Sequence, residues 1–357
     1  MRAAGIDRPL ALIDVLIRGA GPVGCTLALA LRASALQVRL FDRAAAAAPF
    51  RPIALSHGSR LIFERLGLWH GIETTPIETI VVTQAGGFGR TELRARDAGV
   101  PALGYVIDYA SLTAALRAAV AHLLVDEPLE ARCTVHAEGS AADAVEKRYG
   151  QHALVALIDT KPQATASAFE RFAPEGPLAL LPLRGSYALI WTTSPARAQA
   201  LAASDEETFL RALADAAGTK PGRPIGVRSR SVHPLVLRVR AAHPAPREVY
   251  IGNAAQTLHP VAGQGLNLGL RDAWELAREF LHAPDPGAGA TLARYAARRR
   301  LDATATIRVT DWLAGGFLGA NSFSRAARGV ALTALDLFPG PRRFFARRMI
   351  FGRSGLP

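Results

Sequence analysis

The stretch VLIRGAGPVG, residues 15–24, decides the fold. Its first three residues are apolar and mostly β-branched, which is typical of a buried parallel strand. The glycines that follow have the spacing G-x-G-x-x-G: Gly19 permits a tight turn, Gly21 lets the backbone approach a pyrophosphate, and Gly24 lets a helix pack closely on the strand. The N–H groups and the dipole at the start of that helix favour an anionic ligand.

The sequence after the glycines completes a βαβ unit. Apolar residues recur at helical spacing over 23–31, and residues 38–41 predict a second strand that ends at Asp42, 18 residues after Gly24. A carboxylate there is placed to accept hydrogen bonds from an adenosine ribose. The alternative, a glycine-rich structural turn, does not account for Asp42. The unit therefore predicts dinucleotide binding.

A second glycine-rich loop, GNAAQTLHPVAGQGLNLG at residues 252–269, lies between a predicted strand at 249–251 and a helix that begins near Asn267. Such a loop presents backbone N–H groups to an anionic or polar ligand. We expect the chain to fold back so that the two loops hold the two ends of one extended cofactor. His259 in this loop is either a general acid or base or a structural turn residue before proline.

Composition limits the class of protein. The chain has 357 residues, which is enough for about two domains, and half of them are hydrophobic, which excludes a disordered protein. Two cysteines, Cys25 and Cys133, exclude a disulfide scaffold and a Cys-based zinc cluster and fit a reducing compartment. No window has the roughly 18 apolar residues of a membrane span, so we expect a cytoplasmic protein. We also expect no metal site.

The middle of the chain predicts a sheet. Apolar, partly β-branched runs at 77–83, 152–158, 178–183 and 187–191 indicate strands, and helices are expected at 111–124 and 205–217. Five segments together resemble the flavin-dependent monooxygenases of ubiquinone biosynthesis, in particular the 2-polyprenyl-6-methoxyphenol hydroxylase branch. They are GAGPVG (19–24), RPIALS (51–56), GYVIDY (104–109), YGQ (149–151) and the run 252–272.

The resemblance, which covers residues 15–311, implies an α/β fold: a Rossmann-type FAD-binding domain of the aromatic hydroxylase kind, a sheet-based substrate domain and a helical C-terminus. The implied FAD-binding domain is discontinuous and consists of residues 12–72, 104–148 and 247–312. Residues 73–103 and 149–246 would form the substrate domain, and residues 313–357 a basic helical segment. The implied activity is the hydroxylation of a lipophilic, polyprenylated phenol, with FAD as cofactor and NAD(P)H and O₂ as co-substrates.

The same resemblance implies the cofactor site but no catalytic residue. The three glycines of the first motif and Asp42 would hold the ADP half, Arg51 would lie over the cofactor, and Asn253 would meet the ribityl chain or the pyrophosphate. The backbone from Pro260 through Asn267 would line the isoalloxazine. The full set of implied cofactor-binding residues is Gly19, Gly21, Gly24, Asp42, Arg43, Arg51, Gly252, Asn253, Pro260, Gly263, Gly265, Leu266 and Asn267.

One segment departs from the family pattern. Relatives place a β-meander and an Asp-Gly or Glu-Gly motif between the GYV and YGQ segments, but here about 30 residues separate Tyr105 from Glu138, whose Glu-Gly pair is taken as the remnant of that motif. Three further strands at about 3.3 Å per residue do not fit beside the expected helix, so the domain is predicted to be shortened between 110 and 138. This leaves a second hypothesis, a catalytically impaired homologue that serves as a binding or scaffold subunit of a quinone-biosynthesis assembly. Glu138 is then either functional or a loop carboxylate.

The C-terminal segment is basic and aromatic. The formal charge is +12, and residues 325–353 contribute half of it, with seven arginines and one acid (7 − 1 = +6), interleaved with phenylalanines. Such a segment suits an anionic membrane surface, where a polyprenyl substrate resides, or a partner in a quinone-biosynthesis complex. A solvated packing helix and codon bias toward arginine are the alternatives; no nucleic-acid-binding motif accompanies the charge. We expect a peripheral position at the inner face of the membrane.

Overall fold

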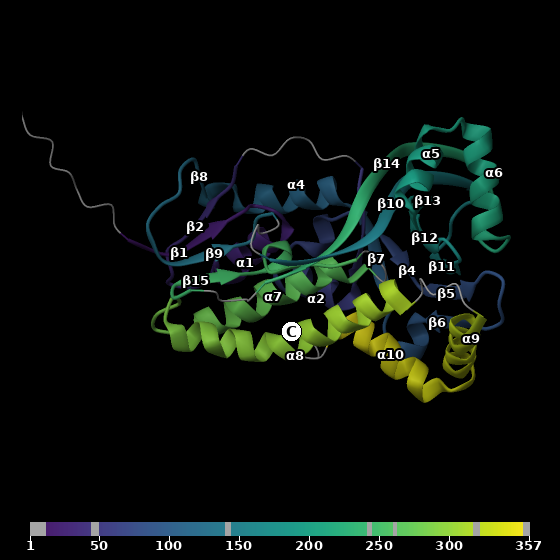
Figure 1. Ribbon diagram of the computed structural model, residues 1–357. Coiled ribbons are helices and arrows are strands. Elements are labelled where there is room, and N and C mark those ends of the chain that lie inside the picture. Colours follow the sequence, from purple (N-terminus) through teal and green to yellow (C-terminus); the bar gives the residue numbers. More distant parts are fainter. Residues whose placement is uncertain are drawn as a thin grey trace, which may run out of the picture.

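The computed structural model describes residues 12–43, 50–139, 144–240, 245–259, 263–316 and 322–352. A five-stranded parallel sheet forms one end of the molecule (Figure 1). Its strands, in spatial order, are β15 (Glu248–Tyr250), β9 (Ala131–His136), β1 (Ile13–Arg18), β2 (Val38–Phe41) and β8 (Leu124–Val125). The order places β1, which precedes the first glycine motif, at the centre of the sheet, so the motif begins at the carboxyl end of a central strand.

The predicted βαβ unit is confirmed. β1 pairs in parallel with β2, with Val15 opposite Val38, and α1 (Pro22–Leu31) connects them. Val15 and Ile17 are fully buried because β1 lies inside the sheet, and the apolar face of α1 packs on it. Helix α1 also contacts α4 (Tyr109–Val120) and α7 (Gln264–Leu281), and α7 in turn packs on α8 (Gly289–Gly316).

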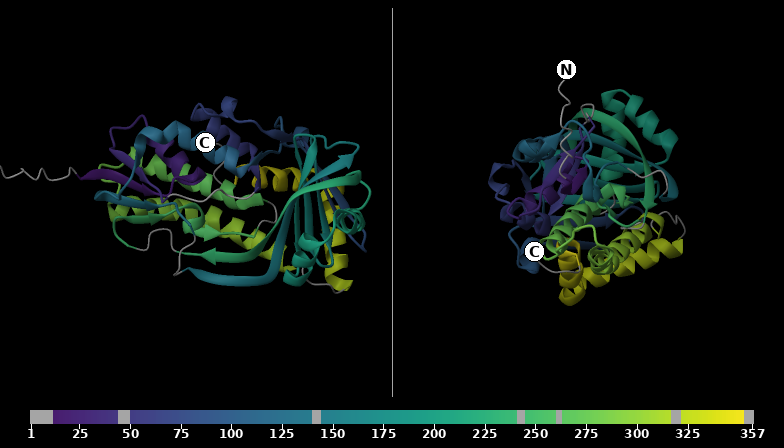
Figure 2. Two further views of the ribbon diagram at one scale, coloured as in Figure 1. Left: turned by 90° about the horizontal axis from the view of Figure 1, so that it is seen from above. Right: turned by 90° about the vertical axis from the view of Figure 1, so that its left-hand side faces the viewer.

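An eight-stranded sheet forms the other end of the molecule. Its strands, in order, are β16 (Gln256–Thr257), β14 (Arg223–Val239), β10 (Val145–Lys161), β13 (Ser186–Thr193), β12 (Gly176–Leu183), β11 (Ser167–Ala173), β5 (Thr79–Gln84) and β6 (Arg90–Arg94). The four predicted strands of the middle region are confirmed as β5, β10, β12 and β13. Helices α5 (Pro195–Ala203) and α6 (Glu206–Ala217) cover one face, where an apolar core forms around Trp191 and Phe209. The strands β10 and β14 are long and run from this sheet toward the parallel one, which Figure 2 shows from above.

A small antiparallel sheet lies between these two. Strand β7 (Gly104–Asp108) is its centre, flanked by β3 (Pro52–Ser56) and β4 (Thr75–Ile77). The remaining short elements are α2 (His57–Arg65), η1 (Trp69–Gly71), α3 (Ala95–Ala98), η2 (Ala121–Leu123) and η3 (Gly252–Ala254). The segment with the missing meander is fully described: α4, η2, β8 and β9 follow one another, and only residues 126–130 separate β8 from β9.

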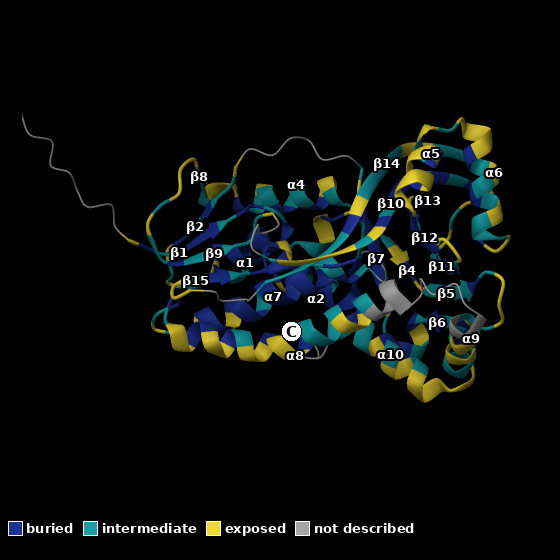
Figure 3. Ribbon diagram, viewed as in Figure 1, coloured by how far each residue is buried: buried dark blue, intermediate teal, exposed yellow. Residues whose placement is uncertain are grey.

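The C-terminal segment is helical and packs on the rest of the molecule. It consists of α9 (Ser322–Leu337) and α10 (Pro339–Phe351). Ala346 and Ile350 of α10 are buried in an apolar cluster with Leu93 and Ala95. A Cβ on Gly58 of α2 would come within 2.7 Å of the Ile350 carbonyl oxygen, so the two helices lie very close together. Figure 3 shows that the outer faces of α9 and α10 remain exposed.

Candidate functional site

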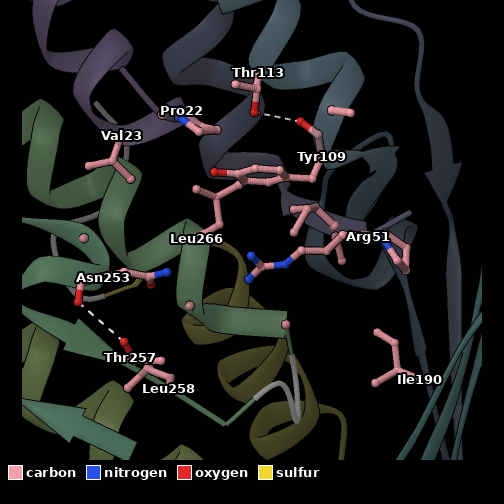
Figure 4. A pocket seen from close by; sticks show the side chains of 18 of the residues that line it. Pro22, Val23, Arg51, Tyr109, Thr113, Ile190, Asn253, Thr257, Leu258 and Leu266 are labelled. Carbon is pink, nitrogen blue, oxygen red and sulfur yellow. Dashed lines mark hydrogen bonds between the residues drawn. The ribbon is translucent and has the colours of Figure 1, made fainter. Parts of the chain in front are cut away.

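A cavity of about 920 Å³ joins the two glycine-rich loops to one face of the eight-stranded sheet. That volume is near the upper end of the usual range for small-molecule sites. One end of the cavity is polar and is formed by the first glycine motif, Asp42 and Asn253; the other end is apolar and is formed by β5, β11, β12 and β13. Figure 4 shows side chains that line it.

The three glycines of the first motif have different surroundings. Gly19 has φ +107°, and a Cβ there would come 2.8 Å from the Glu138 backbone nitrogen. A Cβ on Gly24 would come 2.0 Å from the Gly19 carbonyl oxygen, so Gly24 is required for packing and does not line the cavity. A Cβ on Gly21 would meet only the Tyr109 hydroxyl, at 3.5 Å, and would occupy cavity space. Gly21 is also the N-cap of α1 and provides no side-chain cap, so the first N–H groups of the helix are available to a ligand.

Asp42 lies at the end of β2 and lines the polar end of the cavity. Its carboxylate forms an ion pair with Arg117 of α4, and Arg117 Nη1 also lies 3.4 Å from the Ala20 carbonyl oxygen. Arg117 is a cavity residue that the sequence did not indicate. Arg43, the next residue after Asp42, is exposed and is not part of the cavity lining.

The second loop is held by Asp272 of α7. Its carboxylate accepts hydrogen bonds from the Gly252 N–H, at 3.2 Å, and from the Gln256 side chain, and it is paired with Arg299 of α8 at 2.6 Å. Gly252 has φ +60° and packs directly on Val23 of α1, which brings the second loop against the first motif. Gly252 and Asn253 line the cavity, so the structure brings the two loops together as expected.

Asn267 fixes the loop from inside the protein. Its Oδ1 accepts hydrogen bonds from the Ser56 N–H at 2.8 Å and the Ser59 hydroxyl at 2.7 Å, and its Nδ2 donates to the carbonyls of Ala54 and Gly263, both at 2.8 Å. The side chain is buried and does not line the cavity. The cavity is lined instead by the neighbouring Gly263, Gly265 and Leu266. Pro260 lies outside the described residues.

Arg51 extends into the cavity beside Tyr109 (Figure 4). Its guanidinium carbon lies 5.1 Å from the centre of the Tyr109 ring, a distance that suits a cation–π interaction. Tyr109 begins α4 and was not identified from the sequence as a site residue. Its ring covers the cavity next to the N-terminus of α1, because its hydroxyl faces Gly21.

His259 and Glu138, the two residues with open interpretations, both line the cavity. His259 is buried, and its ring lies edge-on to the Tyr149 ring with 5.1 Å between the ring centres. Burial lowers the pKa of His259 to about 4, so its imidazole is neutral near pH 7. Glu138 forms an ion pair with Arg18 at 3.3 Å. Among the described residues, no group of three or more His, Cys, Asp or Glu is arranged to hold a metal ion.

The sheet end of the cavity is mostly apolar, and its polar side chains are the carboxyl group of Glu170 and the hydroxyl group of Thr192. Its lining includes Ile77, Ile80, Ala168, Ala179, Leu181 and Ile190, and Glu170 lies among them. A flavin dinucleotide fits this donor set: the glycine cradle and the α1 N-terminus suit a pyrophosphate, Asp42 suits a ribose, and the space beside Arg51 leads to an apolar chamber for a second molecule.

Comparisons with known proteins agree with this geometry. A family model described as an FAD binding domain matches residues 136–310. The chain is 31% identical to the ubiquinone hydroxylase UbiL of Rhodospirillum rubrum, over 94% of this chain and 88% of that protein. It is 27% identical to the 3-demethoxyubiquinol 3-hydroxylase of Escherichia coli, over 81% of this chain and 86% of that protein. Among solved structures, Klebsiella pneumoniae HpxO complexed with FAD and uric acid has a TM-score of 0.77 at 14% identity, covering 96% of this chain and 98% of HpxO, and so supports the fold.

Proposed function

We propose that this chain, which belongs to the flavin-dependent aromatic monooxygenases of ubiquinone biosynthesis, hydroxylates a polyprenylated phenol with NAD(P)H and O₂. FAD is its cofactor, and it is an enzyme of the oxidoreductase class. The observation that carries the proposal is the continuity of one cavity from the glycine cradle to an apolar sheet face. A dinucleotide and an aromatic ring can therefore meet within one cavity.

The residues of the cavity have separate tasks in this proposal. Bound FAD would supply the redox chemistry, that is, the uptake of electrons from NAD(P)H and the activation of O₂. The N–H groups after Gly21 would bind the pyrophosphate, Asp42 would accept a ribose hydrogen bond, and Arg51 would hold the cofactor against Tyr109. Asn267 acts through others, because its four hydrogen bonds fix the backbone that faces the cavity.

The proposal is tested with the purified full-length protein. We expect a visible flavin spectrum, and oxidation of NAD(P)H that a 2-alkylphenol accelerates and that yields one hydroxylated product per NAD(P)H consumed. Flavin binding with no phenol-dependent turnover would contradict the proposed activity and would favour the scaffold hypothesis. The scaffold hypothesis is not favoured, since the two relatives described above, which cover 94% and 81% of the chain, are hydroxylases.

We further propose that an anionic membrane surface is where this enzyme meets its lipophilic substrate. Among the described residues, no helix is both long and apolar enough to cross a membrane. The corner between α9 and α10 exposes Leu337, Phe338 and Phe344, whose exposed fractions are 67%, 59% and 74%, together with the exposed Arg343 and Arg347. We call these five residues the α9–α10 patch. Exposed aromatic and cationic side chains on one corner suit the interface of an anionic bilayer.

A further inference from the structure

Glu170 projects from an apolar sheet face into the cavity. Its cross-strand neighbours are Val82 on β5 and Ala179 on β12, and Ile190 follows in the same row on β13. Residues directly opposite one another in a sheet share a face, so Val82 and Ala179 flank the base of the Glu170 side chain and Ile190 lies on the same face one strand further away. Glu170, Ala179 and Ile190 all line the cavity. The carboxyl group is therefore placed where a second molecule would enter, beyond the cofactor end.

No described residue forms an ion pair or a hydrogen bond with this carboxyl group. Burial raises the pKa of Glu170 from 4.5 to about 7. The adjacent cation, Arg171, lies on the opposite face of the sheet, where its Nη1 would be 3.1 Å from a Cβ on Gly218. A carboxylate without a partner in an apolar environment destabilises a fold, so its presence calls for a role outside folding.

The charged groups of the surrounding elements lie elsewhere in the cavity or at its edge. From α9, Arg328 donates to the Gln84 side chain, which shares a sheet face with Glu170 one row away. The ionisable side chains that line the rest of the cavity are Asp42, Arg51, Tyr109, Arg117, Glu138 and His259. Burial is the cause of the raised pKa of Glu170, and none of these groups contributes to it.

We propose that Glu170 is a catalytic and specificity-determining residue that binds the substrate hydroxyl and takes up its proton, an assignment that rests on the proposed function. The phenolic O–H bond breaks, the proton bonds to a carboxylate oxygen of Glu170, and the electron pair stays on the phenolate oxygen. The phenolate increases the electron density of the ring at the carbon to be hydroxylated. A ring that carries its own carboxylate would place a second negative charge in the same apolar chamber, so the site selects neutral phenols.

The test uses the FAD-loaded enzyme, its Glu170→Gln variant and, as a matched control, Glu92→Gln. The control removes a carboxylate paired with Arg94 on β6, which is separated from the Glu170 strand by β5 in the same sheet. The probes are 2-propylphenol, its methyl ether and 4-hydroxy-3-propylbenzoate. For the wild type and the control we expect kcat/KM for 2-propylphenol to rise with pH through about 7, because Glu170 is a base only above its pKa. Glu170→Gln should lower kcat/KM by about 10²- to 10⁴-fold and flatten this profile.

Binding gives a second readout that does not require turnover. Titration of the flavin absorbance should show that the wild type binds the phenol more tightly than the ether or the benzoate. In Glu170→Gln, the dissociation constants of the three probes should lie closer together. A Glu170→Gln enzyme with full flavin content, the wild-type pH profile and unchanged discrimination would overturn the assignment. If the wild type holds flavin but converts no phenol, the proposed function fails, and the binding comparison still decides whether Glu170 contacts the hydroxyl.

Discussion

Two glycines of one motif have separable roles at the scale of single residues. A side chain at Gly21 would enter the cavity and contact the protein only at the Tyr109 hydroxyl, 3.5 Å away, whereas a Cβ at Gly24 would collide with the Gly19 carbonyl at 2.0 Å. We expect Gly21→Val to fold with a melting temperature near that of the wild-type apoprotein but to lose FAD, since the valine occupies the space of the pyrophosphate. Absorbance spectra of the purified variant measure the flavin content.

Gly24→Ala is the matched comparison. It should lower the free energy of unfolding by about 1–3 kcal/mol, because α1 must move away from the glycine turn. Stoichiometric FAD in purified Gly21→Val would show that the backbone at residue 21 does not approach the cofactor. The contrast follows the separate roles that the sequence motif predicts for the two glycines, and the structure supplies the distances that make it testable.

Single residues also show where sequence reasoning ends. Asp42 could be identified because its distance from the glycines is fixed by one helix and one strand. Glu170 could not be identified, because a lone acid in a strand has the same pattern whether it faces solvent or a cavity, and the strand at 167–173 was itself not predicted. Arg117 and Tyr109 belong to the cavity through the packing of α4 on α1, which is a tertiary contact that no local spacing encodes.

At the scale of elements, the carboxylate of Asp302 joins three helices. It pairs with Arg271 of α7 at 2.9 Å, with Arg299 of its own helix α8 at 2.8 Å and with Arg348 of α10 at 3.5 Å. Asp302, Arg271 and Arg299 are buried, so loss of the carboxylate leaves the Arg271 guanidinium without its ion-pair partner, while Arg299 keeps only Asp272. We expect Asp302→Asn to lower the free energy of unfolding by about 3–5 kcal/mol, measured by urea denaturation. Asp215→Asn, at an exposed position of α6, is the control and should change it little.

The pH dependence of this network has a defined sign. The neighbouring guanidinium groups lower the pKa of Asp302 from 3.8 to about 2, so its contribution is present above about pH 4 and is lost as the pH falls toward 2. The stability difference between the wild type and Asp302→Asn should therefore shrink over that interval. A difference that stays constant from about pH 5 to about pH 2 would show that the carboxylate is not ionised in the folded protein.

Elements with a regular local pattern could be predicted, and those built by long-range pairing could not. The βαβ unit, α6 and α7 have apolar periodicity and clear start or stop signals. The 17-residue strand β14 contains four arginines and two prolines, so its sequence does not read as a strand. Its conformation is stabilised by antiparallel pairing along nearly the whole of β10.

At the scale of the whole molecule, some residues of the basic C-terminal segment pack on the protein and others form the proposed membrane surface, and the sequence could not separate the two groups. Part of its charge is committed inside the protein, since Arg342 pairs with Asp97 and Arg348 with Asp302, and α10 buries Ile350. The segment therefore packs on the protein through part of its surface, and deletion of the whole segment would expose an apolar cluster. The proposed membrane surface is restricted to the α9–α10 patch, whose substitution leaves these ion pairs and Ile350 in place. Arg343 of the patch also donates a hydrogen bond to the Asp97 carbonyl oxygen at 3.0 Å, so the melting temperature of its variant is measured as a control.

We expect the full-length, FAD-loaded protein to sediment with phosphatidylserine–phosphatidylcholine vesicles at low salt and to be released at high salt, because the Debye length falls from about 10 Å at 0.1 M to about 3 Å at 1 M. Each arginine near such a surface contributes about 1 kcal/mol, so Arg343→Gln with Arg347→Gln should weaken binding by roughly 10- to 30-fold. Leu337→Ser with Phe338→Ser and Phe344→Ser should weaken vesicle binding further by removing the apolar contact.

Ile225→Ser, on an exposed part of β14 beside α6, is the matched control and should bind as the wild type does. If the triple variant keeps its flavin and melting temperature and still sediments like the wild type, the enzyme meets membranes through another surface or not at all, and its lipophilic substrate must reach the apolar chamber by a different route.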